Sequence, residues 1–188
     1  MVTNPTDKFE IKDLLDKHCV RSPIQSWDVD AQNRINVQGS VILTHVHPRK
    51  PHLPLSFGTI SGNFVAKGMY LHTLEGAPHH VGGTFNVADS KLTNLKGAPS
   101  HVGDILNVGR NPLTSLEGFP AHVEDAFIFD YDPELPLLRA MTAAKLWPNP
   151  DQEKLEQIFL KYAHKGKAVV LNLALELKQA GFAGNAKW

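Results

Sequence analysis

The sequence has little of what marks several large classes of protein. Only one of its 188 residues, Cys19, is a cysteine, so an internal disulfide is impossible and no cluster of thiolates can hold a metal ion. Lysine and arginine together number 19, as do aspartate and glutamate, so no net charge draws the chain to nucleic acid or to an anionic membrane. No run approaches the roughly 18 apolar residues of a membrane span, and residues 1–20 lack the apolar core of a signal peptide. We therefore expect a cytoplasmic protein.

The sequence signatures of common enzymes are missing as well. There is no Gly-x-Gly-x-x-Gly turn, no phosphate-binding loop, no Gly-x-Ser-x-Gly elbow and no His-Glu-x-x-His helix. Cys19 falls near the end of an apolar helical pattern, whereas activated thiols lie at helix N-termini or beside a base. We therefore expect no catalytic residue, no metal, no cofactor and no small-molecule substrate.

What the sequence does contain is one phrase repeated at a constant interval of 21 residues. LEGAPHHV begins at Leu74, LKGAPSHV at Leu95 and LEGFPAHV at Leu116. A leucine-based period of about 20 to 29 residues is typical of solenoids, in which each unit is stable only when stacked on its neighbours. The predicted fold class is therefore an α/β repeat, a short leucine-rich-repeat-like solenoid of 21-residue coils.

Within each coil the pattern predicts one short strand and an irregular return. Phe85 and Val87 alternate as inward residues of a strand, and so do Leu106 and Val108. The position that holds a buried asparagine in many leucine-rich repeats is occupied in successive units by Met69, Ser90, Asn111 and Asp132. An asparagine ladder is thus kept in one coil at most, and we expect the Gly-x-Pro corner to satisfy the turn amides instead.

Three parts are expected along the chain. Residues 1–38 form a helix (about 6–19) and a cap, because a solenoid must cover its terminal apolar edge. Residues 39–132 form the solenoid, with regular units at 61–132. Residues 133–188 show helical spacing and predict a three-helix C-terminal cap, with LWPNP as a connection and with Trp147 and Trp188 packed inside.

The repeat resembles two groups of proteins. LTNLKGAPSHVGDILNVGRNPLTSLEGFP is similar to the leucine-rich repeats of bacterial type-III effectors. It is more similar to proteins of tailed bacteriophages that carry LTSLEGAP..VGG units before a helical end close to AGF.GNAKW, which here reads AGFAGNAKW. The resemblance implies a repeat fold and a phage origin, and it implies no catalytic residues.

The ten histidines offer a candidate metal site. His80, His101 and His122 share one position of the repeat, and His79 adjoins them. Zinc needs ligands that converge in a tetrahedron, whereas a ladder presents its members in parallel, so we interpret the three as corner residues. A metal-dependent enzyme using these histidines remains an alternative. So does nucleic-acid binding through the basic residues Arg49, Lys50, Lys161, Lys165 and Lys167. The loop that holds Arg49 and Lys50 also carries His45, His47 and His52, which could suggest metal or phosphate binding, but no carboxylate or cysteine lies at ligand spacing beside it.

The positions that alternate with the buried ones form a small, uncharged and partly apolar strip. Its predicted partner-binding residues are Val65, Asn86, Ile105, Asn107 and Ile128. An exposed strand face usually carries charged residues, so this strip is either a docking surface or a face covered by the chain's own helices. We favour docking, and the predicted function is that of a non-enzymatic module that binds a protein partner.

Overall fold

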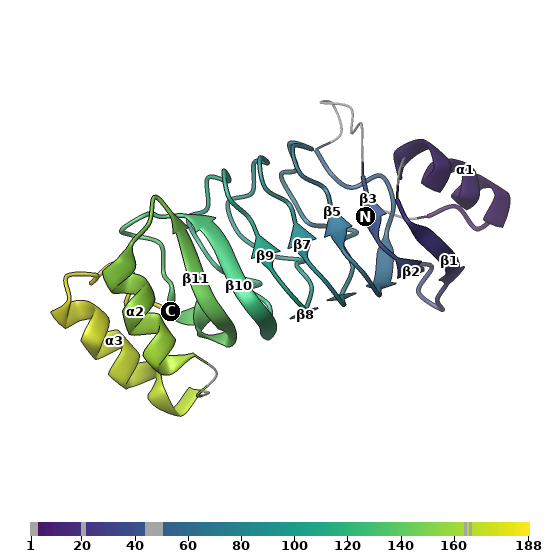
Figure 1. The fold of residues 1–188 in the computed structure, drawn as a ribbon. Helices are drawn as coiled ribbons and strands as arrows, with labels where there is room; N and C mark the ends of the chain where they lie inside the picture. The colour runs from purple at the N-terminus through teal and green to yellow at the C-terminus, as the bar shows by residue number, and fades with distance from the viewer. Residues whose placement is uncertain (1–3, 20–21, 44–50, 164, 166) are drawn as a thin grey trace.

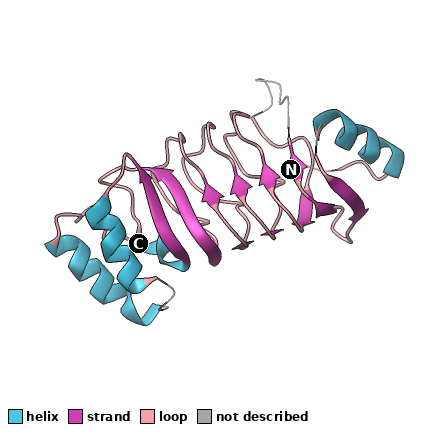
Figure 2. Cartoon of the chain, viewed as in Figure 1, coloured by secondary structure: helices cyan, strands magenta, loops and turns pink. Residues whose placement is uncertain are grey.

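A computed structural model describes every residue except 1–3, 20–21, 44–50, 164 and 166 (Figure 1). The chain forms a β-solenoid of about five turns, an elongated stack of coils with helices at its two ends (Figure 2). Three α-helices occur in the described part: α1 (Lys8–His18), α2 (Glu153–Tyr162) and α3 (Val170–Gln179). None of these helices is long and apolar enough to cross a membrane.

Two ladders of short strands run along the stack. The first contains β1 (Ile24–Val29), β2 (Ile35–Gly39), β4 (Phe57–Ile60), β6 (His80–Val81), β8 (His101–Val102) and β10 (His122–Asp130). The second contains β3 (Val41–Ile42), β5 (Phe64–Val65), β7 (Phe85–Asn86), β9 (Leu106–Asn107), β10 again and β11 (Ala143–Asn149). Every pair is parallel except β1 with β2, which are antiparallel.

The expectation of one strand per coil is wrong for the coils of β4 to β9, each of which contributes two, whereas in the last regular coil β10 runs through both ladders. A bend at residues 82–84 separates β6 from β7, and the glycines of this bend bring successive coils into close contact. A Cβ on Gly82 would lie 2.2 Å from the Ser61 carbonyl oxygen, and one on Gly103 would lie 2.2 Å from that of Gly82. The bend therefore requires a residue without a side chain, and it turns one strand into two.

The core is a column of like residues in register. Phe64 pairs with Phe85, Phe85 with Leu106, and Leu106 with Phe127, one repeat further along the chain at each step. The rings of Phe64 and Phe85 stack with centroids 5.4 Å apart. Each such buried side chain stabilises the stack by roughly 1.5 to 3 kcal/mol.

The return segments turn at the Gly-x-Pro corner, as predicted. Gly97 and Gly118 have φ of 87° and 88°, a left-handed conformation that favours glycine. The next amide closes a tight turn, with Ala98 N–H donating to the Leu95 carbonyl and Phe119 N–H to that of Leu116, each at 2.9 Å. The corner thus pairs the amide of the residue that follows each glycine.

At the N-terminal end, α1 covers the first coil. The Asp7 carboxylate caps the helix by accepting from Phe9 N–H at 2.6 Å, and Ile11 and Leu15 are buried beneath it. The buried Asn4 side chain joins this segment to the solenoid, since its Nδ2 donates to the Asn33 and Ser56 carbonyls at 2.7 and 2.8 Å.

The C-terminal end differs from the expected three helices. The first of them is a short 3-10 segment, η1 (Leu138–Thr142), and all of LWPNP except its last proline lies in β11, which adds to the sheet. Leu146 pairs with Phe127 and is buried, so burial against the last coil overrides the helical spacing. Pro148 is tolerated because β11 lies at the end of the ladder, where an N–H is dispensable.

The aromatic residues of the C-terminal part also differ from expectation. Trp147 and Trp188 are 44% and 53% exposed, so neither is packed inside a cap, and the Arg139 guanidinium lies 5.3 Å from the Trp188 ring centroid. The tail is held instead by Asn185, which is fully buried. Its Nδ2 donates to the carbonyls of Asp132 and Leu135, both at 2.9 Å. The asparagine of AGFAGNAKW therefore joins the tail to the turn after β10.

Candidate docking face

The structure brings the predicted strip together on one face of the second ladder. Val65 pairs with Asn86, Asn86 with Asn107, and Asn107 with Ile128. Ile105 lies just before β9, and all five residues are half-buried. The ladder continues this row at both ends, because Ile42 pairs with Val65 and Trp147 pairs with Ile128. We call Ile42, Val65, Asn86, Asn107, Ile128 and Trp147 the outer column.

The chain's own helices do not cover this face. In Figure 1 the strands β5, β7 and β9 are turned toward the viewer, with α1 beyond one end of the stack and α2 and α3 beyond the other. Among the described residues, no helix passes in front of these strands. The outer column therefore lies at an open surface.

Strand alternation predicts that Ala88, two residues after Asn86, and Ala126, two residues before Ile128, face outward like the strip, but both are buried. Asn86 Oδ1 accepts a hydrogen bond from the Ala88 N–H at 3.1 Å, and the chain turns at this point. Ala126 follows an irregularity in the pairing of β10 with β11, which shifts the alternation. Both deviations are local, and the outer column itself keeps its register.

Amide groups occupy the centre of the outer column. Asn86 Oδ1 accepts from Ala88 N–H and Asn107 Oδ1 from Gly109 N–H, each at 3.1 Å, which fixes the orientation of both carboxamides. Within the described part of the chain, Nδ2 of these two asparagines has no hydrogen-bond acceptor. Two oriented N–H donors thus lie between the aliphatic side chains of Val65 and Ile128, an arrangement suited to a partner's backbone carbonyls and apolar side chains.

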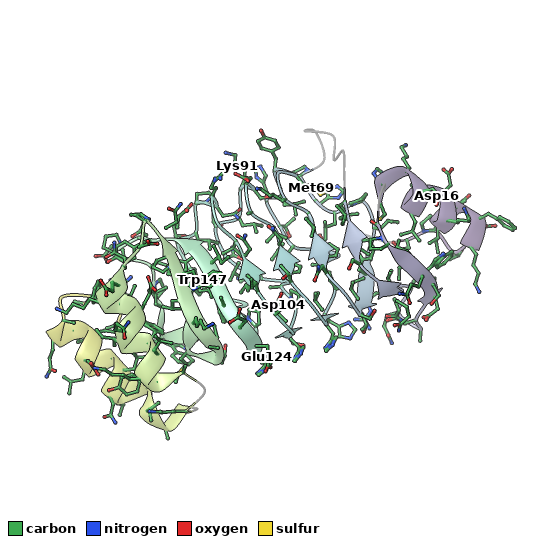
Figure 3. The ribbon with its side chains drawn as sticks, viewed as in Figure 1. Asp16, Met69, Lys91, Asp104, Glu124 and Trp147 are labelled. Atoms are coloured by element: carbon green, nitrogen blue, oxygen red, sulfur yellow. The ribbon has the colours of Figure 1, made fainter. Side chains whose placement is uncertain are left out.

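At its C-terminal end the outer column borders a cleft of about 660 Å³. The lining residues are Ile128, Trp147, Pro148, Asn149, Asp151, Glu153 and Glu156. Figure 3 shows Trp147 over β10 and β11 on the same face as the strands of the second ladder. Sequence reasoning missed Trp147 because the leucine spacing before it resembles a helix. The only signal for a strand was the alternation of Leu146 and Pro148 around it.

The predicted histidine column lies on the first ladder. His80 pairs with His101 and His101 with His122, and their rings stack with centroids 4.6 and 5.0 Å apart and interplanar angles of 5° and 14°. The rings are thus parallel and do not converge on one point. Among the described residues no group of three or more histidine, cysteine, aspartate or glutamate side chains is placed to hold a metal ion.

The surroundings of the central imidazole of the stack, His101, change its pKa. Burial lowers the pKa of His101, and charge on His80 and on His122 lowers it further, while Glu124 opposes the shift. His122 Nε2 lies 2.6 Å from Glu124 Oε2, so the stack ends on a carboxylate. Protonation of His101 is therefore resisted in the folded chain.

This lowered pKa predicts a pH-dependent stability. The unfolded chain takes up the proton near the ordinary histidine pKa of 6.5, before the folded chain does, so the free energy of unfolding falls as pH drops through that value. We expect the thermal midpoint to decrease between about pH 7.5 and about pH 5.5, and the decrease to be smaller in His101→Gln. His72→Gln, an exposed histidine outside the stack, is the control and should keep the full decrease. The same pH slope in His101→Gln as in the unaltered chain would contradict the prediction.

The remaining candidate residues belong to the histidine-rich loop and to the basic tail. His45, His47, Arg49 and Lys50 lie outside the described residues. Nδ1 of His52 lies 2.9 Å from the neighbouring Leu53 carbonyl. In the basic tail Lys161 pairs with Glu176, and Lys165 lies over the Tyr162 ring at 6.0 Å from its centroid. Lys167 lies in the 3-10 segment η2 (Lys167–Val169).

Cys19, the one thiol, is buried at the end of α1. Burial and, to a smaller extent, the nearby Asp16 raise its pKa to about 12. A thiol with this pKa stays protonated near neutral pH and is a poor nucleophile.

Together these features define a class of protein: a β-solenoid with helices at both ends and a row of uncharged side chains on a sheet face open to solvent. Comparison with known proteins adds no relative, since no family model matches the chain and no curated protein or solved structure is significantly similar to it.

Proposed function

We propose that this chain is a non-enzymatic protein-interaction module, a leucine-rich-repeat-like solenoid of tailed-bacteriophage origin. It binds a host or phage protein in the bacterial cytoplasm through the outer column and modulates that protein. The observation that carries the proposal is the outer column itself, a row of apolar and amide side chains at an open face where charged residues would be expected.

The stacked coils also suit this function energetically. A sheet face held by backbone hydrogen bonds and a packed phenylalanine column has little conformational freedom to lose when a partner binds. Interfaces concentrate their binding energy in a few central side chains that lose all contact with water. On this face the centre is Asn86 and Asn107, with Val65 and Ile128 on either side.

The proposal is tested by capture of bound proteins from a bacterial host lysate with the unaltered chain and with Asn107→Arg. An arginine at the centre of the outer column introduces bulk and an unpaired charge, so we expect partner capture to be abolished. The thermal midpoint should move by no more than a few degrees, because surface substitutions usually change stability by less than about 0.5 kcal/mol.

The matched control is Thr93→Arg, which introduces the same side chain at an exposed position of the return segment. This variant should capture the partner as the unaltered chain does. Capture by Asn107→Arg at the unaltered level would show that the partner uses another face. Recovery of RNA alone from the lysate would favour the nucleic-acid alternative.

A further inference from the structure

The cleft at the end of the outer column combines an exposed aromatic ring with carboxylates. Trp147 is 44% exposed and forms the rung next to Ile128, so the cleft is continuous with the proposed docking face. Its opposite wall belongs to the first turn of α2, which packs beside β11 and carries Glu153 and Glu156, with Asp151 just before it.

Within the described residues, the charge of this wall is not neutralised. Asp151, Glu153 and Glu156 form no side-chain hydrogen bond or ion pair in the described structure. Other carboxylates on the same sheet do have partners: Asp125 binds Lys145 at 3.1 Å, and Asp130 accepts from Asn149 at 3.1 Å. The helix N-terminus favours negative charge in its first turn, which explains why these acids are tolerated there. It does not explain an exposed indole opposite them.

A planar cation can interact favourably with both walls of the cleft, the indole ring on one side and the carboxylates on the other. A guanidinium stacks on an indole face and presents a fork of N–H donors to carboxylates, whereas an ammonium is a compact and strongly hydrated charge. We propose that this cleft binds an arginine side chain of the partner protein, inserted between Trp147 and the first turn of α2. This inference rests on the proposed docking function and specifies the chemistry of the partner.

The proposal is tested by NMR on the full 15N-labelled chain. The indole N–H resonance of Trp147 is identified by its loss in Trp147→Phe, and N-acetyl-arginine amide is titrated into the unaltered chain. N-acetyl-citrulline amide, which has nearly the same shape without the charge, is the matched control. We expect a saturable shift of the Trp147 resonance with a millimolar dissociation constant for the arginine probe, no saturable shift for the citrulline probe, and weaker arginine binding at high salt.

Substitutions locate the site. The double variant Glu153→Gln/Glu156→Gln is expected to weaken arginine binding by about tenfold. Glu117→Gln, which removes a carboxylate outside the cleft, should leave the affinity unchanged. Equal binding of the citrulline probe would overturn the proposal, and so would equal binding of N-acetyl-lysine amide or an unchanged affinity in the double variant.

The test separates this inference from the proposed function. Asn107 lies two rungs from Trp147, so Asn107→Arg should still bind the arginine probe. If the probe fails to bind while Asn107→Arg still abolishes partner capture, the docking face stands and the arginine site is wrong. If the probe binds while Asn107→Arg leaves capture unchanged, the arginine site stands and the docking face is wrong.

Discussion

Replacing Leu95 with alanine is expected to lower the free energy of unfolding by about 2 to 5 kcal/mol, the usual cost of removing a fully buried leucine side chain. Leu95 is fully buried in a central coil, where Leu74 and Leu116 occupy the same position in the coils on either side. Its loss would leave a cavity between two layers that depend on each other for burial. Urea denaturation measures the change, with the midpoint moving to lower denaturant at an unaltered slope.

The control is Thr93→Ala, two residues earlier in the same return segment. Thr93 is exposed, and its carbonyl, which accepts from the Thr114 amide at 3.0 Å, is kept in the variant. Its substitution should cost well under about 1 kcal/mol. Equal losses at the two positions would show that the assignment of buried and exposed positions in the return segment is wrong.

Asn111→Ala is expected to cost at least about 3 kcal/mol, although the side chain is polar, because it leaves three buried groups without a partner and each costs about 1 to 3 kcal/mol. Nδ2 of Asn111 donates to the carbonyls of Val87 and Val108 at 3.1 and 2.8 Å, and its Oδ1 accepts from Leu92 N–H at 3.0 Å. Alanine leaves all three buried backbone groups unpaired. Thermal and urea denaturation of the purified variant measure the loss.

Asn172→Ala serves as the comparison, since Asn172 is exposed on α3 and alanine is the better helix former. We expect it to leave stability unchanged or slightly raised. A loss in Asn111→Ala no larger than that in Asn172→Ala would mean that the interior asparagine is dispensable.

The preceding coil shows how the hydrogen bonds of Asn111 differ from those of another residue at the same position of the repeat. Ser90 holds the same position one coil earlier, where its buried hydroxyl has no hydrogen-bond partner in the described structure. Serine is too short to span the coil as the Asn111 carboxamide does. The sequence predicted that an asparagine ladder would be kept in one coil at most, and the hydrogen bonds confirm it.

The repeat made the solenoid predictable. Stacked coils place equivalent residues one above another, so each buried position must carry a similar side chain at every turn, and the spacing appears directly in the sequence. Phe85 and Leu106 were identified as equivalent inward residues in this way, and so were the residues of the predicted docking strip. The helix at the N-terminal end was also predictable, because its capping residue and its apolar spacing are local.

Contacts between residues far apart in the sequence determined the structural features that the sequence pattern did not predict. The second strand of each coil depends on how closely Gly82 and Gly103 approach the coil beneath, a distance that no periodicity contains. The segment around Leu146 was expected to connect two helices of the cap but becomes strand β11, because β10 presents an open edge on which Leu146 is buried against Phe127. Local pattern and tertiary burial disagree there, and burial supplies the larger free energy.

The sequence by itself therefore determined the stacking, the core column and the central residues of the outer column, from Val65 to Ile128, since each depends on a period that every coil repeats. Only the tertiary structure decided that the outer column is open to solvent and that Trp147 extends it to a cleft beside α2. Exposure depends on where the terminal helices pack, and they pack at the two ends, where the end coils would otherwise leave the apolar edge of the core uncovered.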